Sequence, residues 1–153
     1  MRASAGFLFF MLFLAGLAFV NLRGMRESSP VPVTSAEQLA DVAWRPTNIA
    51  EMRLADDTRM TMRFDTGGKV AGDAGCNRFT GSYALKDGKL TFGTLVTSRM
   101  ACPEPANSFE ISFLEALDNT RTAVRAGDRL SLRDDKARSL LRLVKGVGSD
   151  QRK

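Results

Sequence analysis

Hydrophobic and polar residues alternate in short runs along the middle of the chain, which is the pattern of half-buried β-strands. The clearest run covers residues 58–64, where Met60, Met62 and Phe64 alternate with arginine and threonine. Similar runs predict further strands over residues 40–49, 69–73, 79–85, 89–92, 95–99, 120–126, 130–133 and 139–144. The alternation therefore predicts a sheet of short strands.

Residues typical of turns separate these strands. A Thr-Gly-Gly sequence at residues 66–68 turns the chain after the first run. Asp87-Gly88 can adopt the positive φ angles of a tight hairpin turn, so the strands on either side of it should pair antiparallel. Gly127-Asp128 predicts a second hairpin in the same way.

Residues 107–117 have the period of an α-helix, with large apolar side chains recurring at every fourth position. Asn107 and Glu110 resemble a capping box at the start of this helix. Together these patterns predict an α+β fold, a small, mostly antiparallel curled sheet or partly open β-barrel with one covering helix.

An uninterrupted apolar run, Phe7–Val20, follows Arg2 near the N-terminus. Such a run is typical of an export segment. Its length suits the core of a signal peptide, whereas the wider stretch of about 20 apolar residues could cross a hydrocarbon layer of about 30 Å. Residues 1–22 are therefore interpreted as a signal peptide or an N-terminal membrane anchor, and both readings remain open.

The rest of the chain divides by composition. Residues 23–38 are rich in serine and proline and lack periodicity, which predicts a linker. Residues 146–153 have the composition of a flexible tail. The length that remains, residues 39–145, suits one domain with one core.

The overall composition is that of an ordinary globular protein, with 44% apolar and 25% charged residues. Lysine and arginine number 22 against 17 acidic residues, which gives a net charge of +5. The basic residues are interleaved with acidic ones and form no dense stripe that could follow a phosphate backbone. No nucleic-acid partner is therefore expected.

Residues for catalysis are scarce. The chain contains no histidine, which removes the commonest general base and the commonest metal ligand. Its two cysteines cannot complete a structural zinc site, and no glycine loop for nucleotide phosphates is present. The acidic pairs Asp56-Asp57 and Asp134-Asp135 lie in turn-like sequence, where carboxylates are usually solvated. We therefore expect no enzyme, and no catalytic, cofactor-binding or metal-ligating residue.

Cys76 and Cys102 are separated by 25 residues, which is too far for a Cys-x-x-Cys redox pair. An even number of cysteines in an exported chain predicts a disulfide instead. Closing a loop of about 27 residues would stabilise the fold by about 3.5 kcal/mol on the chain-entropy model. The alternative, two buried reduced cysteines as in a cytosolic protein, requires that the N-terminal segment does not direct export.

Three stretches follow one another in the chain: Gly-Cys-Asn-Arg-Phe-Thr-Gly-Ser-Tyr at residues 75–83, Gly-Lys-Leu at 88–90 and Thr-Ser-Arg-Met-Ala-Cys at 97–102. With the helix after them, they resemble the META domain family, which includes the heat-shock-associated protein HslJ, over roughly residues 39–144. The resemblance implies a compact antiparallel β domain with a covering helix, found in bacterial envelope or secreted proteins. It also implies a link to stress and antibiotic tolerance, with no established catalytic activity.

The sequence departs from many members of that family at its N-terminus. Those members are lipoproteins, but Leu17 stands where the acylated cysteine would be. Lipid attachment is therefore not expected.

Most residues of the first motif can be given folding roles. Gly75 and Gly81 allow close backbone approaches or a bulge, and Asn77 can bond its side chain to local backbone in a turn. Phe79 and Tyr83 should share the core-facing side of their strand.

Arg78 is the long charged residue inside this motif. It could lie along the sheet surface or line the mouth of a ligand site, and the surface role is favoured. Thr97 and Met100 belong to the third stretch, at residues 97–102, and are also expected to be structural.

Two functions of different class are expected. The first is a non-enzymatic protein of the bacterial periplasm or cell envelope that binds an envelope protein or supports envelope integrity under stress. The second is a carrier of an apolar or lipid ligand between sheet and helix. Contact with a membrane would come through the N-terminal segment, if it is not cleaved. A continuous apolar cavity below the helix would favour the carrier, whereas a filled core with an exposed apolar patch would favour partner binding.

Overall fold

A computed structural model describes residues 28–146 of the chain, so the expected export segment and nearly all of the expected tail lie outside the described residues. The strands are β1 (Val31–Pro32), β2 (Ala43–Ile49), β3 (Met52–Arg53), β4 (Thr61–Phe64), β5 (Lys69–Asp73), β6 (Arg78–Lys86), β7 (Lys89–Phe92), β8 (Val96–Thr97), β9 (Thr122–Ala126), β10 (Arg129–Arg133) and β11 (Ser139–Lys145). A short 3₁₀ turn, η1 (Ala36–Gln38), precedes β2, and the α-helix α1 (Ala106–Asp118) lies between β8 and β9.

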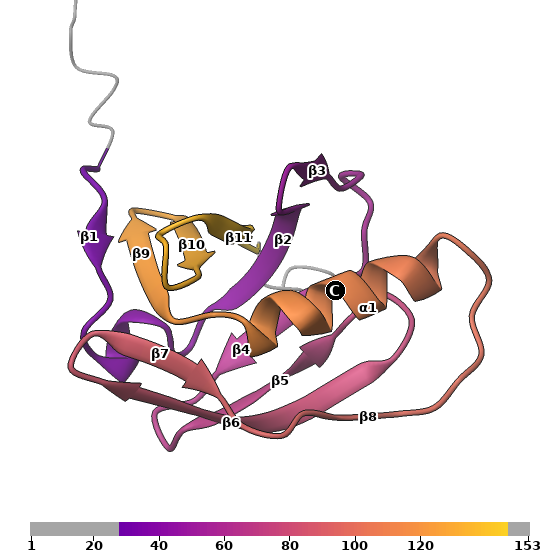
Figure 1. The fold of residues 1–153 in the computed structure, drawn as a ribbon, viewed down its shortest axis with the longest axis horizontal. Coiled ribbons are helices and arrows are strands. Elements are labelled where there is room, and N and C mark those ends of the chain that lie inside the picture. Colours follow the sequence, from indigo (N-terminus) through magenta and orange to yellow (C-terminus); the bar gives the residue numbers. More distant parts are fainter. Residues whose placement is uncertain (1–27, 147–153) are drawn as a thin grey trace, which may run out of the picture.

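The strands form one curled sheet in the order β1-β9-β10-β11-β2-β4-β5-β6-β7, with β3 beside β2 and β8 beside β6 (Figure 1). Every pairing between these strands is antiparallel. The two ends of the sheet approach each other where the N–H of Leu90 in β7 donates to the carbonyl of Arg121, 2.9 Å away, just before β9. The predicted α+β fold with a curled sheet and one helix is confirmed.

The hairpin turns follow the predicted chemistry. Asp87 and Gly88 have φ angles of 52° and 73°, which a two-residue turn between β6 and β7 requires. Gly127, between β9 and β10, also has a positive φ of 57°. These turns set the register of the sheet locally, because a short turn leaves the flanking strands little choice of pairing.

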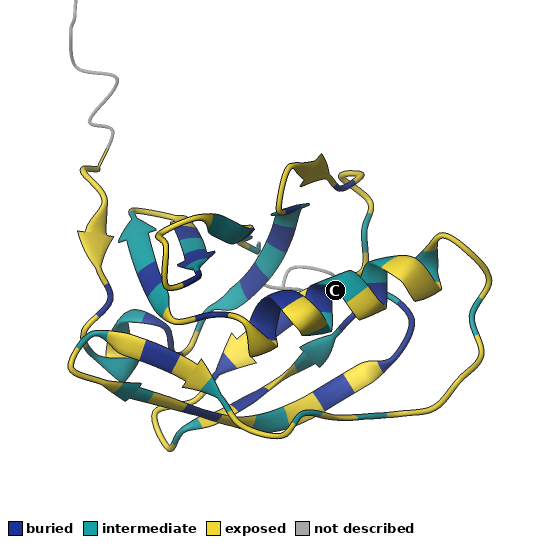
Figure 2. Cartoon of the chain, viewed as in Figure 1, coloured by how far each residue is buried: buried dark blue, intermediate teal, exposed yellow. Residues whose placement is uncertain are grey.

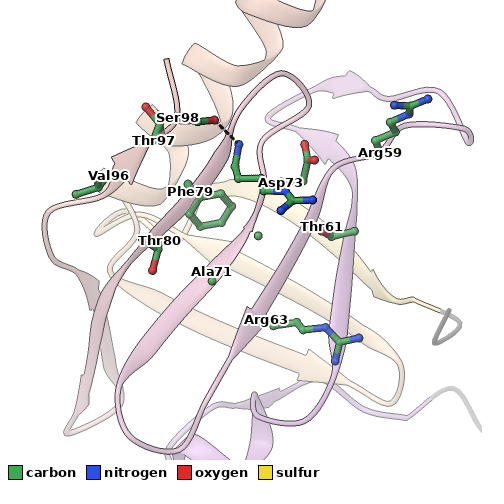
Figure 3. Close-up of a pocket in the computed structure, with 12 residues that line it drawn as sticks. Arg59, Thr61, Arg63, Ala71, Asp73, Phe79, Thr80, Val96, Thr97 and Ser98 are labelled. Atoms are coloured by element: carbon green, nitrogen blue, oxygen red, sulfur yellow. Dashed lines mark hydrogen bonds between the residues drawn. The ribbon is translucent and has the colours of Figure 1, made fainter. Parts of the chain in front are cut away.

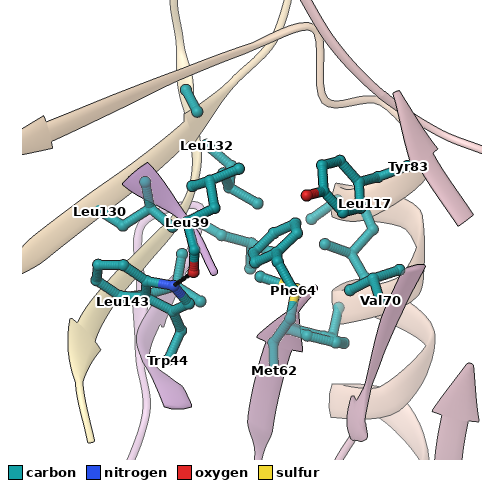
Figure 4. Close-up of a cluster of buried hydrophobic side chains, with 14 of the residues drawn as sticks. Leu39, Trp44, Met62, Phe64, Val70, Tyr83, Leu117, Leu130, Leu132 and Leu143 are labelled. Carbon is teal, nitrogen blue, oxygen red and sulfur yellow. Dashed lines mark hydrogen bonds between the residues drawn. The ribbon is translucent and has the colours of Figure 1, made fainter. Parts of the chain in front are cut away.

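The core lies inside the curl and is filled by alternate residues of the strands (Figures 2 and 4). Met60, Met62 and Phe64 are all buried, as their alternation predicts. Trp44 of β2 is completely buried, and its indole N–H donates to the carbonyl of Leu39 at 3.0 Å. The large side chains at the centre include Val70, Tyr83, Leu117, Leu130, Leu132, Leu141 and Leu143.

The helix packs across one side of this curl (Figure 1). Phe113 and Leu117 of α1 are fully buried, and the ring of Phe113 meets that of Phe79 edge to face at 5.6 Å between centroids. No helix within residues 28–146 is long and apolar enough to span a membrane.

The predicted linker is partly built into the domain. Residues 31–32 form β1 on the outer edge of β9, and the N–H of Val33 continues this pairing to the carbonyl of Ala123 at 2.9 Å. Val33 is also completely buried. Proline is tolerated here because an edge strand leaves one row of backbone groups unpaired. Residues 31–33 of the predicted linker therefore belong to the domain.

The predicted capping box of the helix is wrong. Pro105 occupies the N-cap position of α1, and Glu110 turns inward instead of back to the helix start. The carboxylate of Glu104 takes over part of the capping, since it accepts from the backbone N–H of Ser108 at 3.2 Å and from the Ser108 hydroxyl at 2.6 Å. Asn107 donates to the same carboxylate at 3.2 Å.

Candidate functional site

The first and third motif stretches, residues 75–83 and 97–102, meet at one corner of the sheet, where β6 begins and the chain leaves β8 for the helix. Cys76 and Cys102 form a disulfide there, with their Cα atoms 5.9 Å apart. This separation lies within the range of about 4.4 to 6.8 Å that disulfides require. The bond joins the β5–β6 turn to the segment that leads into α1.

Asn77 lies next to this disulfide and is buried. Its side-chain oxygen accepts from the N–H of Met100 at 2.8 Å and from the hydroxyl of Ser98 at 2.9 Å. Its amide group donates to the carbonyl of Met100 at 3.2 Å. The predicted bonding to local turn backbone is therefore wrong, because the backbone that Asn77 holds is 23 residues further along the chain.

Glu110 completes this cluster from the helix. Its buried carboxylate accepts from the backbone N–H of Asn77 at 2.9 Å and from the Asn77 amide at 3.0 Å. Asn77, Ser98, Met100 and Glu110 are called the Asn77 node below. The sequence pattern assigned Glu110 to a capping box. Its spacing signals a different position, because Phe113 and Leu117 follow it at i+3 and i+7, which places all three residues on the buried face of the helix.

The remaining motif residues pack around β6. Phe79 is 2% exposed and contacts the helix, while Tyr83 is buried against Phe64 with 5.0 Å between ring centroids. The Tyr83 hydroxyl donates to the carbonyl of Asp65. Burial, followed by the nearby carboxylates of Asp65 and Glu37, raises the pKa of the Tyr83 phenol.

The motif glycines stand where a side chain would not fit. A Cβ at Gly81 would come within 2.6 Å of the Leu95 side chain and 2.8 Å of the Thr94 carbonyl. Gly75 has a φ of +100°, which L-residues rarely adopt. These two positions and the buried aromatic residues support an architectural role for the first motif.

Arg78, by contrast, is exposed and lines a shallow hollow of about 700 Å³ that opens over β4, β5, β6 and β8. Figure 3 shows this hollow with Arg63, Thr80 and Val96 among its lining residues. We call it the Thr80 hollow. One row of paired residues crosses its centre, with one residue from each of the four strands. The row runs in the order Arg63, Ala71, Thr80 and Val96. The small side chains in the middle of this row leave the floor low.

Arginines border the Thr80 hollow. Arg59, Arg63 and Arg78 line it with exposed side chains, against one acidic residue, Asp73. The Asp73 carboxylate is itself engaged, since it accepts from the N–H of Gly75 at 2.8 Å. Arg78 thus lies on the sheet surface and at the mouth of a hollow, which are the two positions considered from the sequence. Thr97 also lines the hollow, while the side chain of Met100 is 60% exposed beyond it.

The geometry offers little for metal binding. Within residues 28–146, no three cysteine or acidic side chains come close enough together to hold a metal ion. The surface instead presents arginine donors around a low, partly apolar floor. Such a surface can bind a partner that brings acidic and apolar side chains together.

Comparison with known proteins agrees with this architecture. A family model described as the META domain matches residues 37–146. The NMR structure of a protein from Burkholderia xenovorans is 32% identical, with a TM-score of 0.59, and the match covers 73% of this chain and 86% of that chain. A second protein solved by NMR has the same fold at 23% identity, with a TM-score of 0.61 and coverage of 74% and 96%. The sequence matches none of the curated proteins.

Proposed function

Because the chain belongs to the META domain family, we propose that it is a non-enzymatic protein of the bacterial cell envelope that binds a protein partner through the Thr80 hollow. The observation that carries this proposal is the contrast between a filled interior and a hollow that opens outward.

The interior leaves little room for a ligand under the helix. Phe113 and Leu117 are fully buried there, and Phe79 closes the space between the helix and β6 by direct ring contact. A smaller hollow of about 280 Å³ lies beside α1, but Ser112, Glu115 and Asn119 make its helix side polar. Carriage of an apolar or lipid ligand is therefore the second candidate, and the packing weighs against it.

The Thr80 hollow has the composition of a protein-binding surface. Val96 is 62% exposed at its edge, and Ala71 is exposed on its floor. Arginine is enriched at interfaces because its planar guanidinium can stack and form paired hydrogen bonds. With three arginines and one aspartate, the hollow suits a segment of a partner that carries acidic and apolar side chains.

Export of the domain is part of the proposal. A disulfide between Cys76 and Cys102 is compatible with an oxidising compartment such as the periplasm. A reporter enzyme that is active only outside the cytosol, fused after Lys153, should be active. An inactive fusion that is nevertheless produced in full would contradict export.

We also propose a role in stress tolerance for this chain, which its resemblance to the META domain family suggests. A strain without the protein should grow normally in ordinary medium and poorly under envelope stress. Complementation by the unchanged chain, but not by a variant with Arg63→Glu and Arg78→Glu, would link this role to the Thr80 hollow.

Site-specific crosslinking tests the partner directly. A photoreactive residue in place of Thr80 should crosslink the protein to one envelope protein in living cells. Thr91 on β7 is also an exposed threonine and serves as the matched control position. Equal crosslinking from both positions, or none from position 80 in correctly folded protein, would overturn the proposed surface.

Native mass spectrometry of the exported protein distinguishes the second candidate. We expect the mass of the polypeptide alone, with two hydrogens fewer than the reduced chain because of the disulfide. A lipid of constant mass that stays bound through purification would favour the carrier instead.

A further inference from the structure

A second hollow, of about 600 Å³, lies over the outer face of β2, β3 and β9–β11. We call it the Ser131 hollow. Its basic residues are Arg53, Arg129, Arg133 and Arg142, and Asp56 is the acidic side chain that lines it. The four arginines come from β3 and from the hairpin of β10 and β11, which lie far apart in the sequence.

Strand register brings these arginines together. Ser131 lies opposite Val124 on one side and Arg142 on the other, and Arg142 lies opposite Asn48. Asn48 in turn lies opposite Arg53. A single row across the sheet therefore carries Ser131 next to Val124, and the guanidinium groups of Arg142 and Arg53 follow on its other side.

The other two arginines flank the same serine. Arg129 and Arg133 are two positions before and after Ser131 on β10, so all three point to the same face. Neighbours at this spacing lie about 7 Å apart along a strand. The chain thus places guanidinium groups on several sides of Ser131.

Few carboxylates neutralise this charge. Arg142 approaches Glu51 at 3.9 Å, but the Glu51 side chain is 90% exposed, and such pairs contribute little. Arg53, Arg129 and Arg133 form no ion pair with any of the described residues. The Nε–H of Arg133 is buried and has no hydrogen-bond partner in this part of the chain. A buried donor without an acceptor is destabilising.

Neutral donors accompany the arginines. The hydroxyls of Ser131 and Ser139 lie 3.1 Å apart, so one donates to the other and one hydroxyl hydrogen remains for a ligand. The side-chain amide of Asn48 lines the same hollow. Mixed guanidinium, hydroxyl and amide donors suit an acceptor with several oxygens.

We propose that the Ser131 hollow binds a phosphate-bearing ligand. The fork of an arginine side chain pairs with two phosphate oxygens at once, and a phosphate group accepts several such hydrogen bonds. With four arginines and one aspartate, the hollow has an excess of three positive charges, which suits a diphosphate or two phosphate groups. Apolar residues at its border, including Val124, Val144 and Leu54, would contact the rest of the molecule.

This site is separate from the Thr80 hollow and does not depend on the function proposed above. The two hollows share no lining residue. Loss of phosphate binding would leave the partner crosslink from position 80 in place, and the reverse also holds.

Calorimetric titration of the exported protein with pyrophosphate tests the proposal. We expect one binding site whose affinity falls as salt is added. Arg142→Ala and Arg53→Ala, which change exposed side chains, should each weaken binding by about tenfold or more, as expected for the loss of a charged hydrogen bond. Arg99→Ala removes the same charge from an exposed loop and should leave the affinity nearly unchanged.

Further arms of the titration identify the ligand chemistry and its source. Citrate should bind more weakly than pyrophosphate, and tighter binding of citrate would overturn the assignment to phosphate. Binding to phosphatidylglycerol vesicles, but not to phosphatidylcholine vesicles, in competition with pyrophosphate would assign the phosphate to lipid headgroups. Pyrophosphate binding without vesicle binding would assign it to a free phosphorylated molecule. No pyrophosphate binding by folded protein, or an equal loss in all three variants, would overturn the site.

Discussion

The Asn77 node and the Ser131 hollow are both polar clusters assembled from distant segments, yet they differ in how their hydrogen-bonding groups are used. In the node, the oxygen and the amide of Asn77 bond to Met100, Ser98 and Glu110. In the hollow, the side chains of Arg53 and Arg129 are exposed and take part in no ion pair among the described residues. A satisfied buried cluster holds a fold together, whereas unsatisfied donors at a surface are available for a ligand.

The difference also separates two kinds of residue in the family motif. Three motif residues are buried in the interior, namely Asn77, Phe79 and Tyr83. The two glycines, Gly75 and Gly81, stand where the backbone conformation or a close neighbour disfavours a side chain. Arg78 follows Asn77 directly but points to solvent. Motif residues should therefore affect stability, and arginines on the outer face should affect binding.

The largest effect is expected at Phe79, which lies beside Arg78 on β6. Phe79→Ala should lower the free energy of unfolding by about 3 to 5 kcal/mol, because it removes a fully buried ring that contacts Phe113. Arg78→Ala should change it by about 0.5 kcal/mol or less. Chemical denaturation of both variants provides the measurement, and the reverse order would mean that the facing of β6 is wrong.

Reduction of the disulfide is expected to come next. Breaking the bond between Cys76 and Cys102 should lower the free energy of unfolding by about 3.5 kcal/mol, since the closed loop no longer restrains the unfolded chain. Melting curves with and without reductant measure this effect. A double Cys76→Ser and Cys102→Ser variant should melt at the same temperature in both conditions, and an effect of reductant on it would assign the loss to another cause.

Within the node, Asn77→Ala should lower the free energy of unfolding by about 2 to 3 kcal/mol, because it leaves buried polar groups of Met100 and Glu110 without partners. Glu110→Gln should lower it by only about 1 kcal/mol, since one acceptor oxygen remains. The double variant should lose less free energy of unfolding than the sum of the losses of the two single variants, as expected for residues in direct contact. Additive losses would show that the two side chains do not interact.

The smallest effect concerns Asp134, in the turn between β10 and β11. Burial alone would raise the pKa of this carboxyl, but hydrogen bonds from the Arg138 guanidinium and from the backbone N–H groups of Arg138 and Lys136 hold it below its ordinary value. A lowered pKa means that the folded state favours the charged form. The resulting stability is present above the pKa of the unfolded chain, about 3.9, and is lost as the pH falls through the folded value.

Asp134→Asn should therefore remove part of the loss of stability at acid pH. At neutral pH it should lower the free energy of unfolding by less than the Asn77 node variants do. Melting temperatures measured between pH 2 and 7 test this, with Asp135→Asn as the control because Asp135 is exposed in the same turn. Identical acid profiles for Asp134→Asn and the unchanged protein would contradict the role of the Arg138 contact.

Local sequence pattern was enough to predict most of the sheet. The alternation at Met60, Met62 and Phe64 identified the buried face of β4, and Asp87-Gly88 identified a hairpin whose φ angles are both positive. These predictions held because side-chain alternation and turn geometry depend on residues that are neighbours in the chain. The composition of residues 23–38 predicted a linker and gave no sign of the strand within it. Val33 is buried there because it packs against strands that lie about 90 residues away in the sequence.

The chain's own sequence thus determined that a curled antiparallel sheet with one helix would form, and that Cys76 and Cys102 could be joined. It did not show that Glu110 would receive the hydrogen bonds of Asn77. Nor did it show that Arg142 would lie opposite Ser131, in one row across the sheet with Arg53. Those arrangements depend on the register between strands that are far apart in the chain, and register is decided only when the whole sheet packs its apolar face around one core.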